Sequence, residues 1–202
     1  MSYGLLLAAH LLGAVALGSA IAALYVLDQR IARASDCGTL ARAGRSAAAI
    51  VQRLLMPGVL LLAASGVGLV AGFYDGLGFV RIPWLAGMVG LFVFQSIWAN
   101  TIKRRHGQRL GRLLAGRRAA DRITPELERA RRDPLALFGR RMEPLLFALI
   151  VALGLLRPMA WGVVLAAIAA VLLLAALPAL YAARPPAPTS RSSASVDAEG
   201  RA

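Results

Sequence analysis

The stretch from Leu54 to Phe73 reads LLMPGVLLLAASGVGLVAGF and contains no charged side chain. An α-helix of about 20 residues crosses the roughly 30 Å hydrocarbon core of a bilayer, so this stretch predicts a transmembrane helix. Four further apolar stretches share its character. The sequence therefore predicts an all-α fold, a polytopic transmembrane helical bundle, with five spans at about Tyr3–Leu27, Leu54–Phe73, Ile82–Thr101, Met142–Leu156 and Trp161–Tyr181.

The fourth predicted span is the shortest of the five. Met142–Leu156 ends directly before Arg157 and leaves little length for a full crossing. Extension back to Pro134–Phe138 would supply the missing turns, with Arg140 and Arg141 reaching out to the headgroups. Whether this span crosses the membrane completely is left open by the sequence.

The composition is that of a membrane protein. The 202 residues are 58% hydrophobic with a mean hydropathy of +0.66, whereas soluble domains have about 45–50% apolar residues. The net charge of +13 comes from basic residues in loops beside apolar spans. We expect the lipid bilayer as the main partner, with anionic headgroups bound by the arginine-rich loops, and no nucleic acid. The sequence identifies no protein partner.

The distribution of basic residues predicts an orientation. The loop 28–53 carries five arginines and the loop 102–141 carries thirteen lysines or arginines, whereas the loop 74–81 carries only Arg81. Lysine and arginine accumulate in cytoplasmic loops. We therefore expect a multi-pass protein with its N-terminus outside and its C-terminus in the cytoplasm. The bias toward alanine, glycine and arginine is typical of GC-rich bacteria, which places the protein in a bacterial cell (inner) membrane.

The chain divides into three parts. Residues 1–158 are expected to form a four-helix membrane core with the two basic loops, and residues 159–183 a fifth transmembrane helix. The tail 184–202 is rich in proline, serine and alanine without an apolar face, so it is predicted to be disordered.

His10 lies about two turns into the first span. Its helix face continues with the small residues Gly13, Ala14, Gly18 and Ala22, which allow another helix to approach closely. Because ionisable groups in spans usually face the bundle interior, we expect His10 to point inward. Three interpretations stay open: a hydrogen bond that holds helices together, a ligand for haem or a metal, or a proton carrier.

Met88 is the candidate second ligand. His106 lies at the opposite membrane face from His10, roughly 20 Å or more away, whereas Met88 is at a similar depth in the third span. Histidine and methionine together can ligate haem iron or copper. The tentative cofactor site is therefore His10 with Met88, and haem b is the cofactor considered. Alternatively, Met88 only fills a gap in apolar packing.

The third span also carries the polar residues Gln95, Ser96 and Asn100. They could line a polar path or a quinone headgroup pocket, or they could form hydrogen bonds between helices. Glu143, at the inner edge of the fourth span, is expected to pair with a loop arginine. No phosphate-binding loop, zinc-ligand spacing or nucleophile motif is present, so no catalytic residue is predicted.

Several short motifs are similar to those of a family of bacterial integral membrane proteins, the domain of unknown function numbered 2269. These are HLLGAV from His10, MPGV from Met56 leading to Ser65–Gly66, the segments Pro83–Leu85 and Ser96–Trp98, and GLLRP from Gly154. The resemblance covers about Tyr3 to Pro158. It implies a four-helix membrane core without an assigned activity, to which this chain adds a fifth helix and a tail.

Two families are more distantly similar through an early histidine. One is the haem-binding membrane protoporphyrinogen oxidase family, and the other is the copper-resistance D-type membrane family. The first also has a functional lysine within its third span, whereas Lys103 follows that span here. The leading expectation is a non-enzymatic accessory or minor transport component. The alternative is a haem-b or copper-binding redox protein that uses His10.

Overall fold

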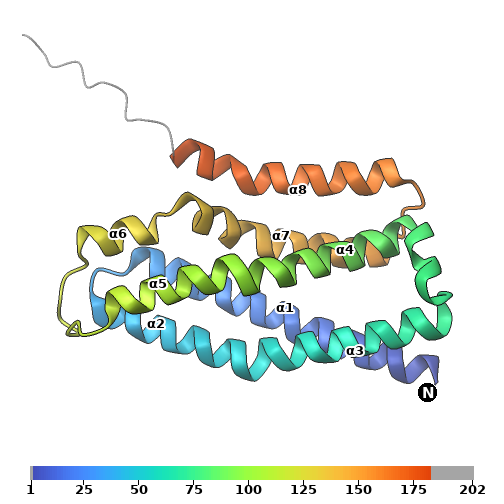
Figure 1. The fold of residues 1–202 in the computed structure, drawn as a ribbon, viewed down its shortest axis with the longest axis horizontal. Coiled ribbons are helices and arrows are strands. Elements are labelled where there is room, and N and C mark those ends of the chain that lie inside the picture. The colour runs from blue at the N-terminus through green and yellow to red at the C-terminus, as the bar shows by residue number, and fades with distance from the viewer. Residues whose placement is uncertain (1, 183–202) are drawn as a thin grey trace, which may run out of the picture.

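A computed structural model describes the backbone of residues 2–182 and the side chains up to residue 177. This part of the chain is helical, without an extended sheet (Figure 1). The predicted disordered tail lies outside the described residues. The elements are α1 (Tyr3–Arg33), α2 (Cys37–Ile50), the π-helix η1 (Val51–Leu55), α3 (Met56–Phe73), the 3₁₀-helix η2 (Gly76–Arg81), α4 (Pro83–Trp98), the π-helix η3 (Ala99–Lys103), α5 (Arg104–Leu114), α6 (Pro125–Arg131), α7 (Pro134–Leu156) and α8 (Trp161–Ala182).

Three helical rods are long and apolar enough to cross a membrane. They are Tyr3–Arg33, Cys37–Phe73 and Pro83–Leu114, the latter two continuing through η1 and η3 without a break. In α8, the stretch with described side chains, Trp161–Leu177, is also apolar but shorter than these rods. The all-α fold is therefore confirmed, and the three rods are compatible with a membrane bundle, whereas the count of five spans stays a prediction.

The predicted loops are largely helical, because helices continue beyond the apolar stretches. α1 has 31 residues, about 46 Å at 1.5 Å per residue, which exceeds the roughly 30 Å hydrocarbon core. α2 covers most of the loop predicted at 28–53. The side chain of Asp36 caps it by accepting a hydrogen bond from the Thr39 backbone N–H at 2.7 Å. α6 begins at Pro125 and ends at Arg131, within the loop predicted at 102–141.

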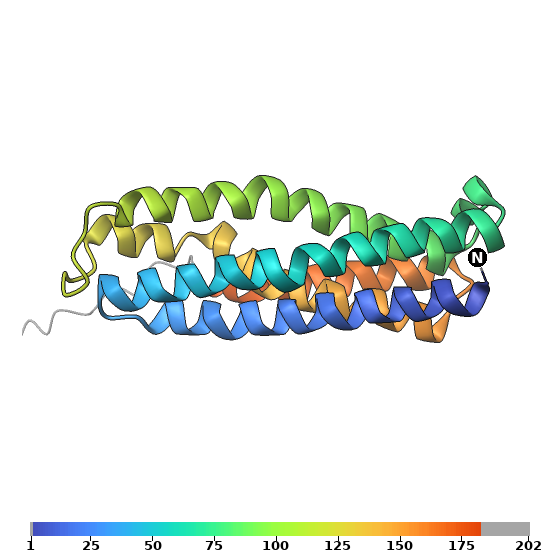
Figure 2. The same cartoon turned by 90° about the horizontal axis from the view of Figure 1, so that it is seen from below.

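Two groups of helices build the bundle (Figure 2). In the first, α1 packs along α3, and in the second, α7 packs against both α4 and α8. Glycines bring α1 and α3 into backbone contact. A Cβ atom on Gly13 would lie 2.7 Å from the backbone nitrogen of Leu62, and one on Gly58 would lie 3.0 Å from that of Leu17. Such close approach is how helices associate tightly in lipid.

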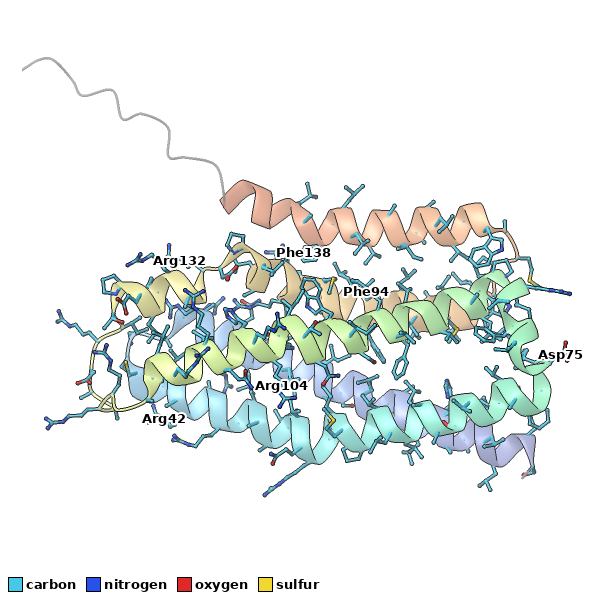
Figure 3. The ribbon with its side chains drawn as sticks, in the orientation of Figure 1. Arg42, Asp75, Phe94, Arg104, Arg132 and Phe138 are labelled. Atoms are coloured by element: carbon cyan, nitrogen blue, oxygen red, sulfur yellow. The ribbon has the colours of Figure 1, made fainter. Side chains whose placement is uncertain are left out.

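Charged side chains lie toward the two ends of the bundle, and the basic ones are concentrated at one of them. Arg42 and Arg132 lie toward one end and Asp75 at the other (Figure 3). We call α2, α5 and α6 the basic cap. At the opposite end, Arg157 adopts a left-handed conformation, φ 48°, and its guanidinium carbon lies 5.5 Å from the centre of the Trp84 ring. The N-terminus lies at this second end (Figures 1 and 2).

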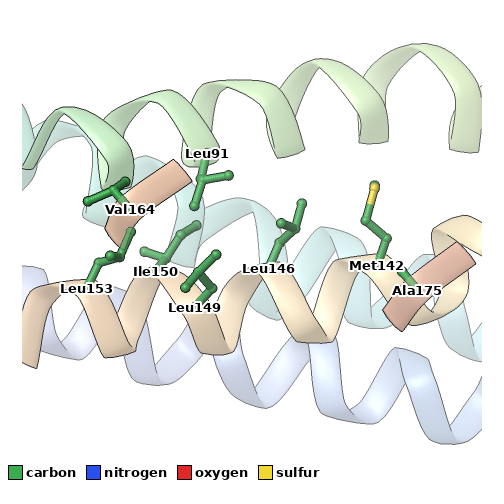
Figure 4. Close-up of a cluster of buried hydrophobic side chains, with 8 residues drawn as sticks. All are labelled: Leu91, Met142, Leu146, Leu149, Ile150, Leu153, Val164 and Ala175. Carbon is green, nitrogen blue, oxygen red and sulfur yellow. The ribbon is translucent and has the colours of Figure 1, made fainter. Parts of the chain in front are cut away.

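The apolar core follows the buried face of α7 (Figure 4). Met142 and Leu146 of α7 are fully buried, and Leu91 of α4 and Val164 of α8 pack against the same face. A smaller core, centred on Cys37, Leu40 and Leu127, holds the basic cap together. The core along α7 therefore joins it to its neighbours α4 and α8, and the smaller core joins the two predicted basic loops.

Backbone hydrogen bonds also link those two loops. The Cys37 N–H donates to the carbonyl of Asp121 at 3.0 Å, and the Gly38 N–H donates to that of Ala119 at 2.9 Å. The two loops thus form one folded unit, which the sequence did not predict.

Candidate functional site

His10 forms a hydrogen bond between α1 and α3. Its Nδ1 lies 3.3 Å from the Ser65 hydroxyl, which itself donates to the Leu61 carbonyl at 2.6 Å. The serine oxygen is therefore the acceptor for an Nδ1–H of the imidazole. Gly66 leaves room for the ring, since a Cβ there would lie 3.3 Å from the Cε1 atom of His10. The imidazole thus points into the bundle at a small-residue contact.

Met88 faces different neighbours from His10. It packs beside the apolar core along α7, and a Cβ atom on Gly154 would lie 3.3 Å from its sulfur. The imidazole of His10 instead meets α3. Within residues 2–177, no cluster of three or more His, Cys, Asp or Glu side chains is placed to hold a metal ion. The cofactor pair His10 and Met88 stays a prediction that nothing in this packing brings together.

The three polar residues of the third span have separate partners. Ser96 donates to the Phe92 carbonyl at 2.8 Å, and Asn100 donates to the Ser96 carbonyl at 2.9 Å, both within their own helix. Only Gln95 reaches another helix, where its Nε2 donates to the backbone carbonyl of Glu143 at 3.2 Å. Ser96 and Asn100 therefore satisfy backbone carbonyls around the wide turn of η3.

A charged cavity of about 360 Å³ lies where α1 and η3–α5 meet the start of α7. Its lining combines both signs of charge with an apolar wall that includes Trp98, Ile102 and Leu135. The charged members are Asp28, Asp133, Glu143, Lys103, Arg105, Arg109, Arg131 and Arg140, and His106 lies among them. A cavity of this size is large enough for a small molecule or a headgroup.

Two ion pairs cross this cavity between helices. Glu143, only 9% exposed, pairs through Oε2 with the Lys103 ammonium group. The expected arginine partner was therefore wrong: η3 continues α4 by one wide turn and brings Lys103 opposite Glu143. The second pair joins the Nε of Arg140 to a carboxylate oxygen of Asp28 at 4.0 Å, too far for a hydrogen bond.

Two buried polar atoms beside these pairs have no hydrogen-bond partner within the described residues. They are Nε of Arg140 and Oε1 of Glu143. The two residues are three apart on α7, so their side chains leave the helix on neighbouring positions. Pro144, on the next turn, has no N–H for the Arg140 carbonyl, which loosens the helix beside the cavity.

Arg131 anchors the cap side of the cavity. Its Nη1 donates to the carbonyls of Ala34 at 2.7 Å and Ile31 at 3.1 Å, and its Nη2 pairs with Glu128 at 2.5 Å. Burial raises the pKa of Glu128, but hydrogen bonds from Arg131 and Arg132 outweigh burial and leave that pKa below its ordinary value. Arg131 therefore ties the last carbonyls of α1 to α6.

The sequence did not predict this cavity. Its charged residues come from segments far apart in the chain. The available signals were an acid inside an apolar helix, Glu143, and another at the end of the first apolar stretch, Asp28. Ionisable groups at such positions usually have partners.

Long apolar helices packed through small residues define the chain as a helical integral membrane protein. The family model described as "Predicted integral membrane protein (DUF2269)" matches residues 4–158, and the chain belongs to this family. The resemblance seen in the sequence motifs is thereby confirmed. No curated protein and no solved structure matches the chain.

Proposed function

We propose that this protein is a non-enzymatic component of a bacterial inner membrane, an accessory or minor transport component. Its orientation is N-terminus outside and C-terminus in the cytoplasm, with five spans. The observation that supports the orientation is the gathering of the basic helices α2, α5 and α6 at one end of the bundle, away from the N-terminus. Basic segments of this kind stay on the cytoplasmic side.

The lengths of the last two helices support five spans. α7 has 23 residues and α8 has 22, about 35 and 33 Å at 1.5 Å per residue, which matches the hydrocarbon core. The charges of α7 lie near its start. Glu143 is neutralised by Lys103, and Arg140 lies near Asp28. Pairing of this kind reduces the cost of charges at the membrane boundary.

Anionic headgroups are the proposed partners of the exposed arginines. Arg104, Arg105 and Arg112 of α5 are exposed, and each basic residue near an anionic membrane surface contributes about 1 kcal/mol of attraction. The basic cap would therefore rest against the inner leaflet.

Reporter fusions test the topology. A fusion in the η2 turn, at Gly76, is expected outside, whereas fusions at Gly116 in the basic cap and at the C-terminus are expected in the cytoplasm. Gly116 is a suitable matched position, because it lies in a turn with open space around it. An external C-terminus would contradict five spans, and a cytoplasmic Gly76 would contradict the orientation.

Purification in mild detergent tests the accessory role. A component of this kind should retain a protein partner or a transported solute, in an amount that scales with the protein. A pure, stable preparation that turns over a substrate without any partner would overturn the proposal.

A redox protein with haem b or copper at His10 is the second candidate. The observation in its favour is the Nδ1 hydrogen bond to Ser65, because ligating histidines usually donate one ring N–H to a protein group and bind the metal through the other nitrogen. A Soret band from protein expressed with ample haem, lost in His10→Ala but kept in His106→Ala, is the expected result. Colourless, copper-free protein from the same expression would overturn this candidate.

A further inference from the structure

The charged cavity beside α7 contains two unsatisfied groups of opposite kind. Glu143 Oε1 needs a hydrogen-bond donor, and Arg140 Nε needs an acceptor, within the part of the chain that the structure describes. Glu143 is 9% exposed. Buried polar groups are normally hydrogen-bonded, and leaving one unsatisfied costs about 1–3 kcal/mol, more for a charged group. This pair of atoms therefore points to an occupant with both a donor and an acceptor.

The two ion pairs of the cavity do not satisfy Glu143 Oε1 or Arg140 Nε. Lys103 binds the other oxygen of Glu143, and Asp28 is 4.0 Å from Arg140 Nε. Arg105 and Arg109 also line the cavity, and neither takes part in an ion pair within the described residues. A simple anion would suit the arginines but not Glu143, and a simple cation would suit only Glu143.

The cavity also has an apolar side. Trp98 packs over Gly139, where a Cβ atom would lie 3.0 Å from the indole nitrogen, and Leu135 is 48% exposed on the same wall. The cavity lies where the apolar helices pass into the basic cap. An occupant with a charged head and an apolar body fits this position.

We propose that the cavity binds the zwitterionic headgroup of an ethanolamine phospholipid. The ammonium group donates to Glu143 Oε1, and the phosphate accepts from Arg140 Nε within the positive field of Arg105 and Arg109. The acyl chains leave along Leu135. The proposal goes beyond the proposed function and does not depend on the orientation of the chain in the bilayer.

The chemistry separates this headgroup from two others. A choline headgroup carries the same charges but no N–H to donate to Glu143. A glycerol headgroup carries the phosphate without a cation. Ethanolamine lipid should therefore bind more tightly than both, while nonspecific attraction to arginines favours the anionic glycerol lipid.

The test measures which lipids the full chain retains. The protein is equilibrated in mild detergent with equal amounts of phosphatidylethanolamine, phosphatidylcholine and phosphatidylglycerol of identical acyl chains, and retained lipid is identified by native mass spectrometry. We expect about a tenfold preference for ethanolamine over choline lipid, which corresponds to about 1.4 kcal/mol. Glu143→Gln should bring that ratio close to one, and Arg140→Gln should lower retention of all three lipids.

Matched variants outside the cavity serve as controls. Glu126→Gln on α6 and Arg81→Gln in η2 change the same charges at exposed positions and should leave the preference unchanged. Equal retention of ethanolamine and choline lipids by the wild type would overturn the proposal. So would a preference that survives in folded Glu143→Gln.

A competition experiment on the wild type covers the case in which a variant fails to fold. Soluble glycerophosphoethanolamine should displace the retained lipid at a concentration at which glycerophosphocholine and inorganic phosphate do not. Equal displacement by inorganic phosphate would identify a plain anion site and overturn the zwitterion assignment. Neither result depends on the reporter fusions, so failure here is distinguishable from failure of the proposed topology.

Discussion

Gly13→Ala should loosen the contact between α1 and α3. The new methyl group would lie 2.7 Å from the backbone nitrogen of Leu62, 3.0 Å from its Cα and 3.2 Å from the carbonyl oxygen of Gly58. All three neighbours are backbone atoms, so no side chain can rotate away. Carbon atoms pack best at about 3.5–4.0 Å, so α1 must move away from α3 by roughly 1 Å at this crossing.

The steric cost can be separated from helix propensity by a matched variant. Extra volume in a packed core costs about 1–3 kcal/mol, whereas glycine to alanine in a helix interior gains up to about 1 kcal/mol. Gly72, on α3, has open space where a Cβ would be placed. Gly72→Ala therefore carries the propensity change alone, and its difference from Gly13→Ala should be about 1–3 kcal/mol.

Thermal unfolding in detergent, followed by circular dichroism, measures this difference. For a chain of this length, each kcal/mol corresponds to about 2–4 °C in Tm. The Tm of Gly13→Ala should therefore lie several degrees below that of Gly72→Ala. The reasoning is refuted if Gly13→Ala is as stable as Gly72→Ala, because α1 and α3 would then not be in backbone contact.

Three further changes probe the basic cap and α4. Arg131→Ala removes two hydrogen bonds to the end of α1, worth about 1.5–3 kcal/mol each as charge-assisted bonds. Labelling of the buried Cys37 thiol should therefore accelerate about tenfold or more in this variant. In the control variant Arg129→Ala, which changes an exposed arginine of the same helix, labelling of Cys37 should keep the wild-type rate. Because the pKa of Glu128 is lowered in the folded protein, the ionised Glu128 stabilises the fold at pH values above its ordinary pKa of 4.5, and this stabilisation is lost as the pH falls through the lower pKa of the folded state. Over that pH range, the rate of hydrogen exchange of α6, corrected for intrinsic rates, should rise in the wild type but not in Glu128→Gln. Gln95→Leu removes one hydrogen bond to α7, about 0.6 kcal/mol in membranes, so a loss of ten degrees in Tm would contradict this assignment.

Hydropathy located the helices well but not their ends. In lipid, backbone groups must bond within the helix, so apolar stretches such as Leu54–Phe73 are strongly constrained to helix. Outside the bilayer this constraint disappears, and a loop or a helix fits the same hydropathy. α2 therefore escaped prediction, because its stability comes from burying Cys37 and Leu40 against the distant Leu127. A contact of that kind leaves no local pattern.

The candidate site shows the same division. The small residues beside His10 correctly indicated an inward direction, because their spacing is a property of one helix. The predicted arginine partner of Glu143 was wrong. The pairing with Lys103 depends on how the wide turn of η3 orients the end of α4 toward α7, which the sequence does not show. Predicting the charged cavity requires the relative rotations of several helices at once, and these cannot be read from a single sequence.

The hydrogen bonds between Cys37 and the segment at Asp121 and Arg122 have a consequence for biosynthesis. The Cys37 thiol and the Arg122 carbonyl are separated by 85 residues, which a ribosome working at about 5–20 residues per second needs roughly 4–17 s to add. During that interval α2 has already been synthesised, but the segment at Asp121 and Arg122 that later covers Cys37 has not. Until the segment at Asp121 and Arg122 is synthesised, the nascent chain therefore carries an uncovered thiol and only part of the smaller apolar core.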